Sequence, residues 1–218
     1  MKIDKDSYGD LALVFVLAAF AIWACLRFVQ PRWLAWTLTA VVWVFAMWQL
    51  FFFRVPERRR AGNGKLISSA ADGRVVIVDE SYEDEVLGRD CKRVCVYMDF
   101  FDVHVNFWPV SGTVKYYRYH AGKHLLAFRP KASEDNEHTT AVILTPDGQE
   151  VLFRQLAGTF ARRIVCYAEP GSEVQAGEQC GIIKFGSRLD IYLPLDAEIR
   201  VKVGDHVKAA EDIIASLR

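Results

Sequence analysis

The sequence has no excess of charge of either sign. Its 218 residues include 27 lysines and arginines and 27 aspartates and glutamates, so the formal net charge at pH 7 is zero. Proteins that bind nucleic acid use a basic surplus to meet the phosphates, and this balance therefore argues against a nucleic-acid partner. Cysteine is also scarce. Its five residues form an odd number without metal-site spacing, so we expect no metal site and no oxidising compartment, with Cys91 and Cys95 as core thiols.

Charge is missing altogether from two stretches, Leu11 to Leu26 and Trp33 to Phe53. The second stretch has 21 residues, enough to cross the hydrocarbon of a membrane as a helix. The first has 16 and spans if Val29 extends it and Arg27 snorkels. A mixed-charge amino-terminus followed by two apolar spans does not fit a cleavable signal peptide. We predict an α-helical transmembrane hairpin over residues 1–53, with a buried helical hairpin in a soluble core as the alternative.

The basic residues that follow the hairpin predict its orientation. They outnumber the two arginines of the connection between the apolar stretches, and they are Arg54, Arg58, Arg59, Arg60 and Lys65. Because basic residues stay on the cytoplasmic side of a membrane, both ends of the hairpin should lie in the cytoplasm. We therefore expect a protein of the cell membrane whose domain at 54–218 faces the cytoplasm.

After Lys65 the apolar runs shorten to strand length and are divided by turn signals such as Asp72-Gly73 and Pro170-Gly171. The runs are Arg74–Val78, Arg93–Tyr97, Val103–Phe107, Thr113–Tyr117, Ala141–Leu144, Val151–Gln155, Arg163–Tyr167 and Leu189–Leu193. This pattern predicts a mostly β fold, a compact body of the sandwich or barrel kind.

One segment of the β region is repeated. Gly171-Ser-Glu-Val-Gln-Ala-Gly-Glu returns 33 positions later as Gly204-Asp-His-Val-Lys-Ala-Ala-Glu. The pattern resembles the half-motif of biotinyl and lipoyl "hammerhead" domains, in which two such hairpins pack quasi-symmetrically. The repeat predicts an arrangement of the backbone and not a chemistry.

Between the two copies lies the dipeptide Gly186-Ser187, flanked by strand-like runs and followed by the last 31 residues. Gly-Ser is common in β-turns, and a turn is the plain interpretation. The alternative is chemical: the Ser187 hydroxyl attacks the Gly186 carbonyl and breaks the backbone. Such a reaction needs a base and a group that orients the base.

The five histidines are the candidate bases. His104 lies in an apolar, strand-like run, where burial would tune its proton affinity. The others are interpreted as solvent or loop residues: His120 and His124 on a short helical turn, and His138 and His206 in loops. Two aspartates could orient His104. Asp72 precedes a glycine, and Asp102 would share the face of His104 on a regular strand.

Taken in order, several segments resemble phosphatidylserine decarboxylase proenzymes of the short, membrane-associated type. They are Phe52-Phe-Arg-Val-Pro-Glu-Arg, Ala71-Asp-Gly-Arg-Val, Phe101-Asp-Val-His-Val-Asn, Pro109-Val-Ser-Gly-Thr-Val, Glu134-Asp-Asn-Glu, Gln155-Leu-Ala-Gly-Thr-Phe-Ala-Arg-Arg-Ile-Val and Ile183-Lys-Phe-Gly-Ser-Arg-Leu-Asp-Ile-Tyr-Leu-Pro. The resemblance covers nearly everything after residue 50.

The resemblance implies that the chain cleaves itself between Gly186 and Ser187 into chains 1–186 (beta) and 187–218 (alpha). Ser187 would become a pyruvoyl group, the only cofactor, with His104 as base and proton donor and Asp72 orienting it. Through a Schiff base with the substrate amine, this group would decarboxylate phosphatidylserine to phosphatidylethanolamine in phospholipid biosynthesis. No metal is implied, and a homodimer is left open.

The chain departs from the family pattern at Val55, where aspartate is usual, and at Phe107-Trp108, where a more polar pair is usual. Neither departure touches the expected triad. Four arginines are candidates for the lipid phosphate, with interface snorkelling or solvated strand ends as the alternative: Arg54, Arg58, Arg162 and Arg163.

Three other functions are weighed. A membrane-tethered carrier or adaptor on the hammerhead repeat would need an exposed lysine at a hairpin tip, and Lys184 is the candidate, without the flanking methionines usual there. A serine hydrolase would use Ser187, His104 and Asp72, yet the chain lacks a Gly-x-Ser-x-Gly elbow around Ser187. An inactive relative is disfavoured by the intact triad candidates.

Overall fold

The computed structural model describes residues 2–58, 64–123, 136–159, 163–184 and 187–218, without the side chain of residue 187. The chain forms two compact units, residues 1–56 and 57–218. Each is described by itself.

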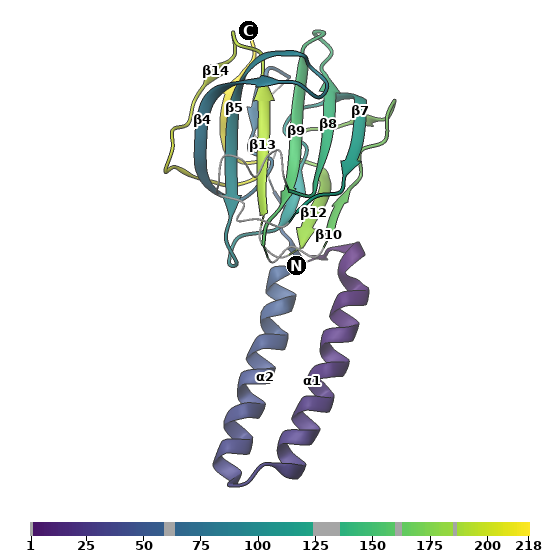
Figure 1. Ribbon diagram of the computed structural model, residues 1–218, viewed down its shortest axis with the longest axis vertical. Helices are drawn as coiled ribbons and strands as arrows, with labels where there is room; N and C mark the ends of the chain where they lie inside the picture. The colour runs from purple at the N-terminus through teal and green to yellow at the C-terminus, as the bar shows by residue number, and fades with distance from the viewer. Residues whose placement is uncertain (1, 59–63, 124–135, 160–162, 185–186) are drawn as a thin grey trace. The chain divides into compact units, whose positions relative to one another are not determined.

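The first unit is an antiparallel helical hairpin (Figure 1). Its helices are α1 (Tyr8–Phe28) and α2 (Arg32–Phe52), preceded by a single 3-10 turn, η1 (Lys5–Ser7). A short ladder between β1 (Lys2–Ile3) and β2 (Arg54–Val55) joins the two ends of this unit. The predicted hairpin is confirmed, and α1 exceeds the uncharged stretch because Asp10 in its first turn and Arg27 in its last complement the helix dipole.

Apolar side chains cover the outside of the hairpin as well as its inner face. Leu13, Val16, Phe20 and Val44 are each more than half exposed. Such a surface is costly in water and ordinary in lipid. Both helices have the length and composition needed to cross a membrane.

The second unit is built from strands. Their bounds are β3 (Leu66–Ser68), β4 (Gly73–Glu83), β5 (Arg89–Met98), β6 (Val105–Phe107), β7 (Gly112–His120), β8 (His138–Leu144), β9 (Glu150–Ala157), β10 (Arg163–Cys166), β11 (Glu173–Val174), β12 (Gln179–Lys184), β13 (Ser187–Leu193), β14 (Glu198–Ile199), β15 (His206–Val207) and β16 (Ile213–Ser216). All eight predicted runs overlap strands. Outside these runs the short strands β3, β11, β14, β15 and β16 were missed, because two to four residues show little periodicity.

The strands form one large curled sheet and two small ones (Figure 1). The large sheet has the order β11-β7-β8-β9-β13-β5-β4-β15, and the small sheets have the orders β10-β12-β6 and β14-β16-β3. The strand β13 lies in the interior of the large sheet, antiparallel to both neighbours, β9 and β5.

The core is formed by the apolar residues on one face of the large sheet and by those of the small sheets. Leu189 and Ile191 of β13 are fully buried in it, as are Ile183 of β12 and Ile214 of β16. The predicted mostly β body is confirmed. The family departures at Phe107 and Trp108 are also buried, each 3% exposed, and Trp108 packs edge-on against Phe153 with ring centroids 5.2 Å apart.

The internal repeat is present in the backbone. Gly171 and Gly204 adopt left-handed φ values of 89° and 99°, and so do Gly177 (81°) and its counterpart Ala210 (63°). The turn at Gly177 donates its backbone N–H to the Trp108 carbonyl at 2.9 Å, and Ala210 donates to the Ser69 carbonyl at 2.8 Å. The hammerhead-like repeat is therefore confirmed as two hairpins with equivalent partners.

Candidate functional site

The position of Ser187 is defined by two strand ladders. It is the first residue of β13, and it pairs with Met98 of β5 on one side and with Ala157 of β9 on the other. Both partners are fully buried. Gly186 and the side chain of Ser187 lie outside the described residues. The predicted cleavage point is thus the junction immediately before an interior strand, where the backbone on the carboxyl side is held from both edges.

His104 lies beside the strand that leads into this junction. Its carbonyl oxygen accepts the backbone N–H of Ile183 at 3.2 Å, and Ile183 is three residues before Gly186. The His104 side chain is fully buried, and its Nδ1 is 3.2 Å from the carbonyl oxygen of Asp102. Because a carbonyl can only accept, Nδ1 carries the proton in this pair and Nε2 is the basic nitrogen.

Asp102 does not share a strand face with His104, and this prediction is wrong. The strand β6 begins at Val105, and the residues before it form a turn because Asp102 accepts the backbone N–H of Asp99 through its carboxylate at 2.9 Å. The Asp102 carboxylate also lies 3.7 Å from Nε2 of His206, which is exposed and belongs to β15 rather than to the expected loop.

Asp72 is nearly buried and is held on both oxygens. Oδ1 accepts the backbone N–H of Ala209 at 2.7 Å, and Oδ2 meets Nη2 of Arg58 at 2.5 Å. Arg58 also reaches Oε2 of Glu211 at 3.2 Å.

The pKa of Asp102 is raised, chiefly by burial. The Asp99 hydrogen bond and the charge of His206 lower this pKa, and the charges of Asp99 and Asp72 raise it. The carboxylates of Asp72 and Asp102 therefore interact electrostatically. The role of Asp72 towards His104 stays a prediction.

Three of the four candidate arginines belong to the part of the chain that the structure describes. Arg54 belongs to the hairpin unit, where its guanidinium donates to the Phe51 carbonyl at 2.6 Å and lies 3.4 Å from the centroid of the Phe51 ring. Arg163 is exposed at the start of β10, opposite Lys184 in the ladder. Arg162 lies outside the described residues. Arg58 is the buried partner of Asp72, with a side chain only 10% exposed.

A buried amide network was missed by the sequence analysis. Gln155 of β9 donates its amide to Oδ1 of Asn106 at 2.8 Å and accepts the Thr139 hydroxyl at 2.9 Å. The Asn106 amide in turn points to the sulfur of Met98 at 3.7 Å, and Met98 is the ladder partner of Ser187. The signal available was a glutamine within an apolar run, because a polar residue buried in a strand needs partners.

The opposite face of β13 holds a buried ion pair that was also missed. The Arg188 guanidinium donates to both carboxylate oxygens of Asp190, at 2.7 and 2.8 Å, and both side chains are fully buried. Charged residues alternating with apolar ones along a strand were the signal. This bidentate pair stiffens the strand directly after the predicted cleavage point.

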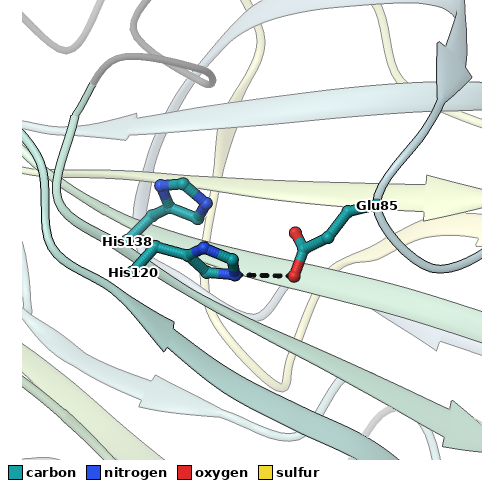
Figure 2. A group of neighbouring side chains, drawn as sticks. All are labelled: Glu85, His120 and His138. Atoms are coloured by element: carbon teal, nitrogen blue, oxygen red, sulfur yellow. Dashed lines mark hydrogen bonds and ion pairs between the residues drawn. The ribbon is translucent and has the colours of Figure 1, made fainter.

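Two more histidine assignments are wrong, in addition to that of His206. His120 is the last residue of β7 rather than part of a helical turn, and His138 is the buried first residue of β8 rather than a loop residue. The β7–β8 register makes them direct partners. Figure 2 shows their rings face to face beside the carboxylate of Glu85, and Nε2 of His120 is 2.7 Å from Oε1 of Glu85. His124 lies outside the described residues.

Lys184 does not fit the carrier alternative. A lysine that receives a prosthetic group has to be exposed, whereas Lys184 is only 3% exposed and lies within β12. The hammerhead-like backbone thus occurs here without an accessible lysine at that place.

Comparisons with known proteins agree on one family. A family model described as phosphatidylserine decarboxylase matches residues 45–215. A protein of Amoebophilus asiaticus is 49% identical over 174 residues, 80% of this chain and 77% of the relative. One of Parabacteroides distasonis is 38% identical over 218 residues, 100% of this chain and 99% of the relative. One of Nitrosomonas europaea is 40% identical over 201 residues, 92% of this chain and 91% of the relative. All three bear the name phosphatidylserine decarboxylase proenzyme.

Proposed function

Because the chain belongs to the phosphatidylserine decarboxylase family, we propose that it cleaves itself between Gly186 and Ser187 and then converts phosphatidylserine to phosphatidylethanolamine. The observation that carries this proposal is the position of residue 187. It begins an interior strand between two buried partners, and the strand that precedes it is hydrogen-bonded to the backbone of the buried His104.

In the first stage His104 removes the proton of the Ser187 hydroxyl. The serine oxygen attacks the Gly186 carbonyl carbon, and the Gly186–Ser187 C–N bond breaks to leave an ester. Loss of the α-proton of residue 187 expels the Gly186 carboxylate and leaves dehydroalanine, which takes up water and releases ammonia to give a pyruvoyl terminus. These steps need no added oxidant or reductant, because the water taken up and the ammonia released account for the change at the terminus. The products are chains 1–186 and 187–218, held together by the ladders of β13.

Asp72 is proposed to keep the imidazole of His104 in its working orientation, as a carboxylate does in other hydroxyl–imidazole pairs. Asp72 is fixed on one oxygen by the Ala209 N–H and on the other by Arg58, so its carboxylate is held in one orientation. Arg58 then acts on Asp72 and not on the lipid phosphate. Arg163, exposed and opposite Lys184, remains a candidate for the phosphate together with Arg162 and Arg54.

A pyruvoyl group supplies an electron sink for the bond that loses carbon dioxide, as pyridoxal phosphate does in other enzymes. Position 187 suits such a group, because its two ladder partners, Met98 and Ala157, are buried and shielded from water. His104 is proposed to return a proton to the former α-carbon of the substrate.

The hairpin is proposed to anchor the enzyme in the cell membrane with the β unit in the cytoplasm. Two apolar helices of spanning length and the basic residues after α2 support this. The substrate keeps its acyl chains in the bilayer, so an anchored enzyme needs to reach only the headgroup.

Intact-mass measurement of the purified chain tests the proposal. The wild type should give two chains, 1–186 and 187–218, the small one lacking one ammonia and reacting with hydroxylamine. Ser187→Ala should stay whole and inactive on carboxyl-labelled phosphatidylserine. Ser172→Ala is a matched control, because Gly171-Ser172 is the chain's other Gly-Ser pair. The Ser172 hydroxyl caps a turn by donating to the Glu169 carbonyl. An active wild type that remains uncut would overturn the proposal.

A further inference from the structure

The fold places three metal-ligating side chains together on the face of the large sheet away from the main core. Glu85, His120 and His138 each offer a ligand atom, and the three atoms lie within 4.8 Å of one another. The two histidines are fixed by the ladder, since they are direct partners at the end of β7 and the start of β8. Their rings stack with centroids 4.4 Å apart and planes 12° apart.

The turn that carries Glu85 is held by the carboxylate of Glu83. The carboxylate of Glu83 accepts the backbone N–H groups of Val86 and Leu87, at 2.9 and 2.8 Å. Glu83 also binds Nη2 of Arg154 at 2.9 Å, which ties the turn to β9. The position of Glu85 is thus set by buried contacts and not by the sheet alone.

One ring nitrogen of His138 is committed and the other is left as a ligand. Nδ1 lies 2.6 Å from the carbonyl oxygen of Asn136, which can only accept, so Nδ1 carries the hydrogen. Nε2 then has its lone pair. A backbone carbonyl that fixes the tautomer of a histidine is the usual support behind a metal-ligating imidazole.

Glu85 has a similar support. Its Oε2 accepts the Thr140 hydroxyl at 2.8 Å and Nη2 of Arg154 at 2.8 Å, while Oε1 faces Nε2 of His120. The Thr140 hydroxyl and Arg154 thus hold the Glu85 carboxylate in place.

The charge around the cluster suits a cation. Glu83 and Glu85 contribute two negative charges and Arg154 one positive charge, which leaves a net charge of −1 with neutral histidines. The side chains of His120 and Glu85 are 23% and 15% exposed, so an ion and a water molecule have access.

We propose that Glu85, His120 and His138 form a site for a divalent transition-metal ion such as Zn²⁺, bound by Oε1 of Glu85 and Nε2 of both histidines. Zinc accepts such nitrogen and oxygen ligands at about 2.0–2.2 Å, and a water completes four-coordination. The ion replaces the hydrogen shared by His120 and Glu85, and the more exposed His120 ring tilts out of the stack so that both lone pairs converge.

The bound ion joins the turn after β4 to the paired ends of β7 and β8. Its role is structural and separate from the cleavage chemistry. Because two of the three ligands are imidazoles, Cu²⁺, Zn²⁺, Ni²⁺ and Co²⁺ should bind in preference to Mg²⁺ and Ca²⁺, which favour oxygen ligands.

Titration of the full chain in detergent with Co²⁺ tests the site, using tag-free protein first stripped with a chelator. One equivalent of Co²⁺ should produce visible d–d absorption, and one equivalent of Zn²⁺ should remove it and raise the thermal midpoint. His120→Gln and His138→Gln should abolish the absorption. His206→Gln is the matched control, since His206 is an exposed histidine outside the cluster. Thr140→Val removes a hydrogen bond to Glu85 and should weaken binding about 10-fold or more.

Retention of the near-ultraviolet circular dichroism of the wild type shows that each variant is folded before its metal binding is judged. No absorption at one equivalent in the wild type overturns the proposal, and so does absorption that survives in a folded His138→Gln variant. Because Ser187→Ala should bind Co²⁺ like the wild type, the metal site and the self-cleavage fail or succeed separately.

Discussion

Asp72 occupies in one half of the internal repeat the place that Ser111 occupies in the other. The backbone N–H of Ala209 donates to Oδ1 of Asp72 at 2.7 Å, and that of Ala176, 33 positions earlier, donates to Oγ of Ser111 at 2.9 Å. Each side chain caps the turn of one hairpin. The glycines that follow them, Gly73 and Gly112, pair with β15 and β11 in the same way. Asp72 differs from Ser111 in having a second oxygen and a charge.

This equivalence separates the capping role of Asp72 from its proposed catalytic role. Asp72→Asn keeps an acceptor for Ala209, so the fold should be retained, while self-cleavage should slow by about 100-fold or more because the imidazole loses its charged partner. Ser111→Ala should cost about 1 kcal/mol of stability and leave cleavage unchanged. Gel densitometry of the two chains over time and thermal unfolding measure these effects. Normal cleavage in Asp72→Asn would assign Asp72 to structure alone.

Arg58 provides a second test, because it is held by Asp72 rather than left free for a lipid. Arg58→Met keeps most of the side-chain volume but strands the buried carboxylate, so stability should fall by about 3 kcal/mol and self-cleavage should slow. Glu211→Gln removes the other, one-third-exposed partner and should cost less than about 1 kcal/mol. If Arg58 instead contacts the lipid phosphate, Arg58→Met would cleave normally and show only a raised KM for phosphatidylserine.

Gly73, next to Asp72, is required by close packing. Its φ is 145°, and a Cβ at this position would lie 2.1 Å from the backbone oxygen of Tyr97. Gly73→Ala should therefore destabilise the β unit by at least about 3 kcal/mol and prevent cleavage. Gly64→Ala, where a Cβ meets nothing within 4 Å, should change stability by less than about 0.5 kcal/mol. Equal thermal midpoints for the two variants would contradict this packing.

Stability should decrease at alkaline pH because of the thiol of Cys166, which is half-buried against the core. Burial raises the pKa of Cys166 to about 11, whereas an unfolded cysteine titrates near about 8.5. Between these values the unfolded chain loses a proton that the folded chain keeps, so the free energy of unfolding falls as pH rises from about 8.5 to 11. Cys166→Ala should make the thermal midpoint less dependent on pH in this range. An unchanged slope in the variant would show that Cys166 ionises freely in the folded protein.

Several features could be predicted from local pattern. The uncharged stretches predicted both helices, and the strand-length runs around Val94, Phe153 and Ile191 predicted strands, since hydrophobicity and periodicity are properties of neighbouring residues. The 33-residue echo predicted two equivalent hairpins. The family assignment followed from motifs in order along the chain.

The contacts of single polar residues could not be predicted in this way. His120 and His138 were assigned to a helical turn and a loop because a glycine follows His120 closely and a polar stretch precedes His138. The partner of Arg58 is 14 positions away at Asp72 and 153 away at Glu211. Asp102 was expected to share a face with His104 only on a regular strand, and the turn that replaces such a strand depends on a hydrogen bond to Asp99 that no periodicity reveals.

The sequence alone determined the apolar helical hairpin, the β character of the rest and the dipeptide at which cleavage is proposed, because each depends on residues adjacent in the chain. Only the tertiary structure decided that Asp72 meets Arg58, that Gln155 reaches Asn106 and that Glu85 lies beside two histidines. Those contacts are set by the register and stacking of sheets, which bring distant segments together through the burial of their apolar neighbours.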